Sequence, residues 1–381
     1  MRFYLKCCLV LLSTLLFAQN EALQQYILTN TKEIEADTRD FKGLSFLDTL
    51  LANKRIVFLG ESSHGTEEYS RTKLQLIKYL HKKLGFNVVL FESPMTAGTY
   101  FNLARDTASA GELIRNSIQN IWHTKTVLQL FDYMKENELS FGGIDPQFIP
   151  SKYPDLIYAN AFSNYPDIKN DLIGLENRIS EAFKNGQNSK RLTDSISNAY
   201  AGLLSKLDKI SLSPLQEWMK HIVSININYY ARLNNGDERD LCMVKNLVWL
   251  AENTYPKEKI IVWAHNTHID KNSLNRSKFM GKILAEHFGP QMYGVGLYMV
   301  NGATALNDRT IITVKVPPKN SLEGLLSARG FKTAFIATND SSFNRQLTTF
   351  HWGKTRQDLN LSKSYDAVIL INGVSAPEYL K

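Results

Sequence analysis

Five side chains that can transfer protons or carry charge come directly after strand-like runs of the sequence. Three runs rich in valine, isoleucine and leucine each lead into a carboxylate or an imidazole. The positions are Glu61 and His64 after residues 55–60, Glu92 after residues 87–91, and His265 and His268 after residues 259–264. Such runs are typical of strands buried on both faces, as in a parallel sheet. Ligands bind beyond the carboxyl ends of such strands, so we expect the five side chains to meet in one enzyme pocket.

The turn around His64 has the composition of a catalytic loop. Gly60 ends the first run, and Gly65 allows a tight turn and a close approach of the backbone to a ligand. An imidazole can accept a proton near neutral pH, and Glu61, three residues earlier, can orient the ring and stabilise the imidazolium. The alternative is a structural turn histidine before a helix whose N-terminus carries Glu68. The other residues at strand ends favour catalysis.

Glu92 ends a wholly apolar run, where an uncompensated carboxylate would be costly to bury. It can be catalytic, and it can form a salt bridge with Lys73 or Arg71; the two interpretations are compatible. His265 and His268 form a His-x-x-His pair, which together with the carboxylates could bind a metal. The spacing matches no specific zinc signature, so we expect neither metal nor cofactor, and a metal site remains the alternative.

Further polar residues are expected to support the site or to bind substrate. Asp145 ends a predicted strand over residues 139–144, Arg239 begins a helical segment, and His123 follows a tryptophan and can line the cleft. Asp240 has a simpler interpretation as a negative charge near a helix N-terminus. Four histidines lack a carboxylate neighbour at a strand end and are interpreted as surface or core residues: His81, His221, His287 and His351.

The order of the predicted elements indicates an α/β protein. A strand–helix–strand unit occupies residues 55–92, and strand-like runs resume at residues 259–264, 292–298, 333–337 and 366–371. Residues 150–256 lack such runs and have helical patterns instead. We therefore expect a three-layer α/β/α fold with a mostly parallel sheet. One domain over residues 19–381 would include a helical insertion at about 150–256, over the carboxyl ends of the strands.

Composition and charge narrow the classes of function. The chain has 381 residues, of which 44% are apolar, and a formal net charge of +7 without a concentrated basic run. Nucleic-acid binding is therefore not expected. The expected partner is a small molecule, and the sequence indicates no oligomeric state.

The first 18 residues have the pattern of a secretory signal peptide. Arg2 and Lys6 precede an apolar stretch over residues 7–17, and Ala18 follows. We expect cleavage there and export to the periplasm or the medium, without stable membrane association afterwards. An uncleaved anchor is the alternative. Cys242 would be the one cysteine left, so no internal disulfide is expected.

Several stretches together resemble the erythromycin esterase family over about residues 40 to 375. The strongest match is in residues 56–92, with Leu-Gly-Glu-Ser-Ser-His-Gly-Thr at residues 59–66, then Lys73, then the strand that ends in Glu92. Further matches are Gly-Ile-Asp-Pro-Gln at residues 143–147, Arg239 and Asp240 with Met243, Asn246 and Trp249, Trp-Ala-His-Asn at residues 263–266 with His268, and Tyr-Asp-Ala-Val-Ile at residues 365–369.

The resemblance implies a three-layer α/β/α fold and metal-independent hydrolysis of a carboxylic ester, with a macrolide lactone as the best single substrate. It implies that His64 is the general base that activates water and that Glu61 is its partner. The same resemblance places Glu92, His265 and His268 in the inner shell of the site.

Two positions near this shell have further implications. Lys73 matches a basic position that could stabilise the oxyanion, and Arg71 is close enough in sequence to substitute for it. After Trp122 the family often has an acidic residue, whereas this chain has His123. That wall of the pocket is therefore expected to differ.

Three other functions are compatible with these residues. They are a metal-dependent hydrolase, a haem- or metal-binding surface protein of related fold, and an enzyme of cell-surface polysaccharide metabolism. A nucleophilic serine is not expected. Ser62 and Ser63 adjoin His64, but the chain has no Gly-x-Ser-x-Gly motif around them.

Overall fold

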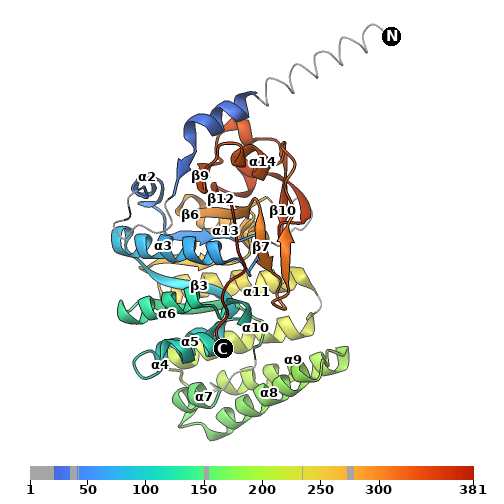
Figure 1. The fold of residues 1–381 in the computed structure, drawn as a ribbon. Helices are drawn as coiled ribbons and strands as arrows, with labels where there is room; N and C mark the ends of the chain where they lie inside the picture. Colours follow the sequence, from blue (N-terminus) through green and yellow to red (C-terminus); the bar gives the residue numbers. More distant parts are fainter. Residues whose placement is uncertain (1–20, 35–40, 42, 150–153, 234, 273–278) are drawn as a thin grey trace, which may run out of the picture.

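The computed structural model describes residues 21–34, 41, 43–149, 154–233, 235–272 and 279–381. The predicted signal peptide, residues 1–18, lies outside these ranges. An eight-stranded sheet forms the centre of the molecule (Figure 1). In spatial order its strands are β1 (Lys32–Glu33), β9 (Thr333–Ala337), β12 (Ala367–Ile371), β6 (Met292–Met299), β2 (Ile56–Leu59), β5 (Lys259–Trp263), β3 (Phe86–Pro94) and β4 (Ser140–Asp145).

Six of these strands, from β12 to β4, run parallel to one another. At the other edge β9 is antiparallel to β12, and β1 is antiparallel to β9. The predicted α/β fold with a mostly parallel sheet is therefore confirmed. The register aligns Leu59 of β2 with Trp263 of β5, and Trp263 with Phe91 of β3. The carboxyl ends of three strands thus meet side by side.

The four residues of β2 are buried and alternate between two hydrophobic clusters. Ile56 and Phe58 belong to one cluster, and Val57 and Leu59 to the other. Burial on both faces explains why the run is continuously apolar. One face is covered by α2 (Phe46–Leu51), α3 (Glu67–Leu84), α5 (Ala110–Ser117) and α6 (Lys125–Glu136). The opposite face is covered by residues 21–30, α11 (Gly236–Trp249), α13 (Met280–Phe288) and α14 (Leu322–Ser327).

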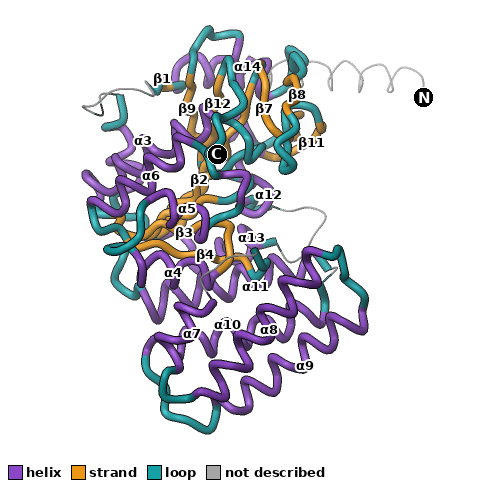
Figure 2. The backbone as a smooth tube through the Cα atoms, turned by 60° about the horizontal axis from the view of Figure 1, so that its bottom comes forward, coloured by secondary structure: helices purple, strands orange, loops and turns teal. Residues whose placement is uncertain are grey.

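The chain between β4 and β5 is helical over most of its described length. Its elements are α7 (Pro154–Phe162), α8 (Pro166–Lys184), α9 (Lys190–Leu207), α10 (Pro214–Ala231), α11 and a π-helical turn over Leu250–Thr254. Figure 2 shows α7 to α10 as a helical lobe beyond α11, at the β4 side of the sheet. α4 (Met95–Ala104) contacts both β4 and α7, so it joins the lobe to the sheet. These helices lie within the predicted insertion.

Two β-hairpins that the sequence did not predict lie beside the carboxyl end of β2. They pair β7 (Gly302–Ala305) with β8 (Ile311–Val314), and β10 (Gln346–His351) with β11 (Thr355–Asn360). Trp352 and Gly353 lie in the loop of the second hairpin with positive φ of 48° and 60°. The Trp352 N–H donates to the Ser62 carbonyl at 2.8 Å, and the Ala305 N–H donates to the Gly65 carbonyl at 2.8 Å. Both hairpins therefore hold the loop that follows β2.

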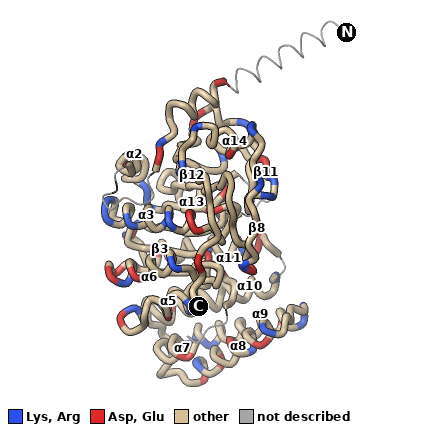
Figure 3. The backbone as a smooth tube through the Cα atoms, viewed as in Figure 1, with Lys and Arg blue, Asp and Glu red and all other residues tan. Residues whose placement is uncertain are grey.

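The remaining short elements are the 3₁₀ turns Asn120–Trp122, Gly289–Gln291 and Ser341–Phe343, together with α12 (Asn266–Ile269) and α15 (Leu361–Ser364). Basic and acidic residues are interspersed along the backbone in the view of Figure 3. Among the described helices, none combines the length and the apolar character that crossing a membrane requires.

Candidate active site

The carboxylate of Glu61 is buried at the end of β2 and accepts four hydrogen bonds. Oε1 accepts from His64 Nδ1 at 2.7 Å and from the indole N–H of Trp122 at 3.0 Å. Oε2 accepts from Lys73 Nζ at 2.6 Å and from the indole N–H of Trp263 at 3.0 Å. Burial alone would raise the pKa of Glu61, but Lys73 and His64 outweigh burial and lower it. The carboxylate is therefore ionised and fixed in one orientation.

Lys73 projects from α3 into the protein interior and is fully buried. Its ammonium lies 4.2 Å from the ring centroid of Trp263, in a cation–π contact. Burial lowers the pKa of Lys73 to about 8, against the opposing effect of Glu61. Lys73 is still mostly protonated at neutral pH, so it neutralises Glu61 from the side opposite His64. The expectation that Lys73 stabilises an oxyanion is wrong, because its ammonium is enclosed behind Glu61.

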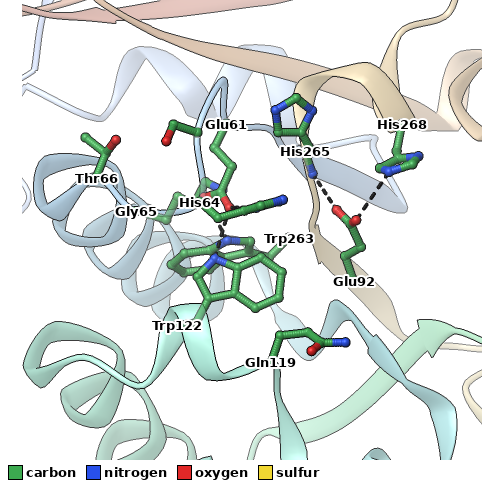
Figure 4. A network of polar contacts seen from close by, with 12 residues as sticks. Glu61, His64, Gly65, Thr66, Glu92, Gln119, Trp122, Trp263, His265 and His268 are labelled. Atoms are coloured by element: carbon green, nitrogen blue, oxygen red, sulfur yellow. Dashed lines mark hydrogen bonds and ion pairs between the residues drawn. The ribbon is translucent and has the colours of Figure 1, made fainter. Parts of the chain in front are cut away.

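His64 lies at the surface of a cavity, with its ring held from behind. Nδ1 is bound to Glu61, so Nε2 is the nitrogen that remains for a ligand. The ring contacts Trp122 edge-on, with 5.0 Å between ring centroids, and its centroid lies 5.1 Å from that of the His265 ring. Figure 4 shows the ring extending from Glu61 toward the side of the site that carries Glu92 and His265. This is the placement that a general base requires.

The two serines next to His64 are engaged elsewhere. Ser62 shares a hydrogen bond of 2.7 Å with the Tyr69 hydroxyl, and Ser63 shares one of 2.8 Å with the Thr304 hydroxyl. Both serines have no exposed surface. The geometry therefore agrees with the prediction that neither is a nucleophile.

A second cluster of charges surrounds Glu92 at the end of β3. Arg239, from the first turns of α11, donates to Glu92 Oε1 at 2.7 Å and to Asp145 Oδ2 at 2.5 Å. His268 Nε2 lies 3.2 Å from the same Glu92 oxygen, and His268 Nδ1 lies 2.8 Å from Asp240 Oδ1. Asp240 is thus a partner of His268, and the simpler interpretation as a helix charge missed this contact.

The protonation of His268 follows from these neighbours. Burial alone would lower the pKa of His268, but Glu92 and Asp240 raise it to about 10. The ring is then an imidazolium, which donates from Nε2 to Glu92 and from Nδ1 to Asp240. Arg239 Nη1 also lies 3.2 Å from His268 Nε2. Because both groups are cations, this contact is not a hydrogen bond. Glu92 contacts both cations. Burial would raise the pKa of Glu92, but His268 and Arg239 hold it well below its usual range.

His265 begins α12 and has a different protonation state. Its Nδ1 accepts from the Thr267 backbone N–H at 3.2 Å, and its own backbone N–H donates to Glu92 Oε2 at 2.8 Å. Burial, reinforced by the His64 ring, lowers the pKa of His265 well below its usual value. Nδ1 also lies 2.8 Å from the Thr267 hydroxyl, which can donate to it as well, so the neutral ring that accepts at Nδ1 carries its proton on Nε2. That nitrogen is buried and has no hydrogen-bond partner among the described residues.

His351 is a residue of the site that sequence reasoning missed. It ends β10 and stacks on His265, with 5.2 Å between ring centroids. Its two ring nitrogens are buried without a partner in the described chain, and burial lowers its pKa to about 4. The sequence predicted a surface or core position for His351. The residue is buried, but it also lines the cavity. No strand-end pattern precedes it, because the β10–β11 hairpin was not predicted.

These groups surround a cavity of about 590 Å³ at the carboxyl ends of β2, β3, β4 and β5. Its walls include His64, Glu92, Asp145, Arg239, His265 and His268, so the predicted convergence of distant residues is observed. Gln119, Thr267, Asn307, His351, Trp352 and Arg356 complete much of the wall and were not predicted. Among the described residues, no group of three or more metal-ligating side chains is arranged to hold a metal ion.

Besides Lys73, three predicted supporting residues lie away from this cavity, so their expected placement is wrong. Glu68 accepts from the Ser375 backbone and hydroxyl at 2.7 and 2.8 Å, and so holds the C-terminal segment. Arg71 is exposed and pairs with Glu67 at 3.2 Å. His123 Nε2 lies 3.1 Å from the Ile118 carbonyl. The pocket wall that His123 was expected to change is formed by its neighbours, Gln119 to Trp122.

Comparison with known proteins identifies the family. A family model for erythromycin esterase matches residues 81–374 of the chain. The chain belongs to the erythromycin esterase family. The Bacillus subtilis protein "Putative hydrolase YbfO" is 29% identical, with 93% of this chain and 92% of that protein covered. Erythromycin esterase type II of Escherichia coli is 21% identical, with 89% and 93% covered.

Solved structures show the same fold. The open conformation of the erythromycin esterase EreC superposes with a TM-score of 0.69 at 18% identity, covering 91% of this chain and 98% of that structure. The predicted family is therefore confirmed. Membership in the erythromycin esterase family and the similarity to a protein named as a hydrolase support a hydrolase.

Proposed function

We propose that this chain hydrolyses carboxylic esters and that its substrate is a lactone of the macrolide type. The observation that carries the proposal is the buried pair of Glu61 and His64, joined at 2.7 Å, with the His64 ring at the cavity surface. Family membership and the similarity to an erythromycin esterase of Escherichia coli support the substrate class. The export predicted from residues 1–18 would place the enzyme where it meets such compounds first.

The proposed reaction begins with water in the cavity. His64 Nε2 takes a proton from the water as its oxygen bonds to the ester carbonyl carbon, and Glu61 stabilises the imidazolium that forms. The bond between that carbon and the alcohol oxygen then breaks. His64 returns the proton to the departing oxygen, so the products are an acid and an alcohol, or one hydroxy acid from a lactone. No group on the protein is acylated.

The developing oxyanion would be stabilised from the His265 side of the cavity. The His265 ring lines the cavity and its Nε2 has no partner among the described residues, but that nitrogen is buried, so it reaches a substrate oxygen only when the ring turns toward the cavity. The cations of His268 and Arg239 line the same cavity and are fixed by Glu92, Asp145 and Asp240. Donors that are already oriented stabilise such a charge without reorganisation.

The proposal is tested with a panel of macrolactones, small lactones and simple esters incubated with the purified protein. Mass spectrometry reports the gain of one water by a lactone or the appearance of acid and alcohol. We expect turnover of a macrolactone by the parent protein, and none above background by His64→Ala. A parent protein that hydrolyses no member of the panel contradicts the proposal. Activity that is lost with a strong chelator and restored by zinc or manganese would replace it with metal-assisted hydrolysis.

A further inference from the structure

A second cavity, of about 490 Å³, is lined by residues of α8, α9 and α10. Figure 2 shows these three helices together in the helical lobe. Aliphatic and aromatic side chains together form most of its walls, among them Ile179 from α8, Leu192 and Ile196 from α9, and Leu233 after α10. Gln187, Asn188 and Thr193 add polar groups. Phe183 stands at its rim with 62% of its surface exposed. An apolar hollow of this size is unusual on a lobe with no role in the chemistry, since exposed apolar surface commonly marks a binding site.

This cavity adjoins the catalytic one. Gln119 and Gln147 line both cavities. The Gln147 backbone N–H donates to Asp145 Oδ1 at 3.0 Å, and Asp145 also binds Arg239. The two cavities therefore share a boundary at Gln119 and Gln147, beside the charged cluster. A molecule long enough to pass these amides would touch both sets of walls.

The two cavities differ in chemistry. The catalytic cavity is lined by imidazoles, carboxylates and a guanidinium, whereas the second is lined mainly by hydrocarbon. We propose that the second cavity is a subsite for an apolar limb of the ester substrate, while the carbonyl lies at His64. The inference rests on the proposed function and narrows it to esters with a long aliphatic or alicyclic limb.

The subsite predicts how the affinity for a ligand changes with the length of its apolar chain. Each methylene group that moves from water into an apolar pocket tightens binding about fourfold. A homologous series of ligands should therefore bind more tightly with each added carbon until the second cavity is filled. A polar catalytic cavity without this subsite would give a flat series.

The test uses methyl ketones from 2-hexanone to 2-dodecanone, which have a carbonyl but no ester bond to hydrolyse. Calorimetry measures their Kd with the full-length parent protein and with Leu192→Gln, which places an amide in the subsite wall. Leu204→Gln is the matched control, because Leu204 is also partly buried on α9 but does not line either cavity. Ala182→Phe, which fills the cavity from α8, provides a second variant.

We expect the parent protein and Leu204→Gln to show the same gain of about fourfold per methylene. Leu192→Gln should lose most of that gain. Ala182→Phe should raise the Kd of 2-dodecanone at least tenfold and change the Kd of 2-hexanone little. A flat series with the parent protein overturns the subsite. So does a series with equal slopes for Leu192→Gln and the parent, because the methylenes would then bind elsewhere.

The same preparations separate this inference from the proposed function. Phenyl acetate has too short an acyl group to need the subsite, so its hydrolysis reports the catalytic pair alone. Hydrolysis together with a flat ketone series overturns the subsite and leaves the esterase intact. A steep ketone series in a protein that cleaves no ester overturns the esterase and leaves an apolar ligand site.

Discussion

His64 and Lys73 bind opposite oxygens of one carboxylate, at 2.7 and 2.6 Å from Glu61. His64 faces the cavity and Lys73 is enclosed, so Glu61 keeps its charge in the interior and directs it at the His64 ring. A buried carboxylate with one partner fewer would be costly to keep ionised. The loop after β2, which carries the proposed base, and a buried lysine of α3 thus form one electrostatic unit.

Removal of the proposed base should reduce turnover with little effect on folding. A positioned general base contributes about a hundredfold to ten-thousandfold in rate, so His64→Ala should lower kcat by that order on any confirmed ester. The ring lines a cavity, and its loss should leave thermal unfolding nearly unchanged. His287→Ala is the control, because His287 is exposed and pairs with Glu252 far from the cavity. Near-normal turnover in His64→Ala would make His265 or His268 the next candidate.

Substitution of the enclosed lysine should affect stability first. Lys73→Met leaves Glu61 buried without its strongest cationic partner, and breaking a buried pair in this way costs about 3–5 kcal/mol. Urea unfolding of the parent and the variant measures the difference. Glu61→Gln in the Lys73→Met background should recover part of the loss, because the remaining amide carries no charge. Additive losses in the double variant would contradict the pairing.

The raised pKa of His268 predicts a dependence of stability on pH. Its pKa is 6.5 in an ordinary environment and about 10 in the fold, so the stabilisation is fully present below pH 6.5 and is lost as pH rises toward 10. The contribution of this one proton falls by about 1.4 kcal/mol per pH unit within that window. The free energy of unfolding should therefore fall more between pH 6 and pH 8 in the parent than in His268→Gln. Parallel curves would show that the imidazolium is not held by Glu92 and Asp240.

Ser63→Ala should keep turnover within about tenfold of the parent, because the hydroxyl is buried against Thr304 and takes no part in the proposed steps. Mass spectrometry during turnover should detect no acylated protein. An acyl adduct on Ser62 or Ser63 would require a covalent mechanism and a rearranged loop.

Export is predicted from the first 18 residues, and intact-mass analysis of the fractionated protein tests it. A chain that begins close to Gln19 in the periplasm or the medium agrees with cleavage after Ala18. A cytoplasmic chain that retains Met1 contradicts it.

The sheet and much of the site could be predicted because burial on both faces leaves a clear pattern in sequence. The runs that became β2, β3 and β5 are continuously apolar, and polar side chains mark their carboxyl ends. The packing of α3 likewise follows from its apolar spacing, but the direction of Lys73 does not. A lysine amid a helical pattern is normally exposed, and only the fold shows that its ammonium reaches Glu61.

The far wall of the cavity could not be predicted, for a physical reason. The β10–β11 hairpin has short strands with half-exposed residues, and its turn places Trp352 at φ of 48°, a conformation that a bulky residue rarely adopts. Without the hairpin, His351 has no recognisable context. Asp240 was similarly ambiguous, because a charge near a helix N-terminus is common whether or not an imidazole lies beside it.

The bond from Trp352 to Ser62 also has a consequence for biosynthesis. Residues 62–65 leave the ribosome early, whereas the two hairpins that hold them are among the last segments to be made. A nascent chain can form α3, but it can neither pair β2, whose neighbours β5 and β6 are made much later, nor lock the loop that carries His64. The enzyme should therefore remain inert throughout translation and become competent only when its final third has folded back onto its beginning.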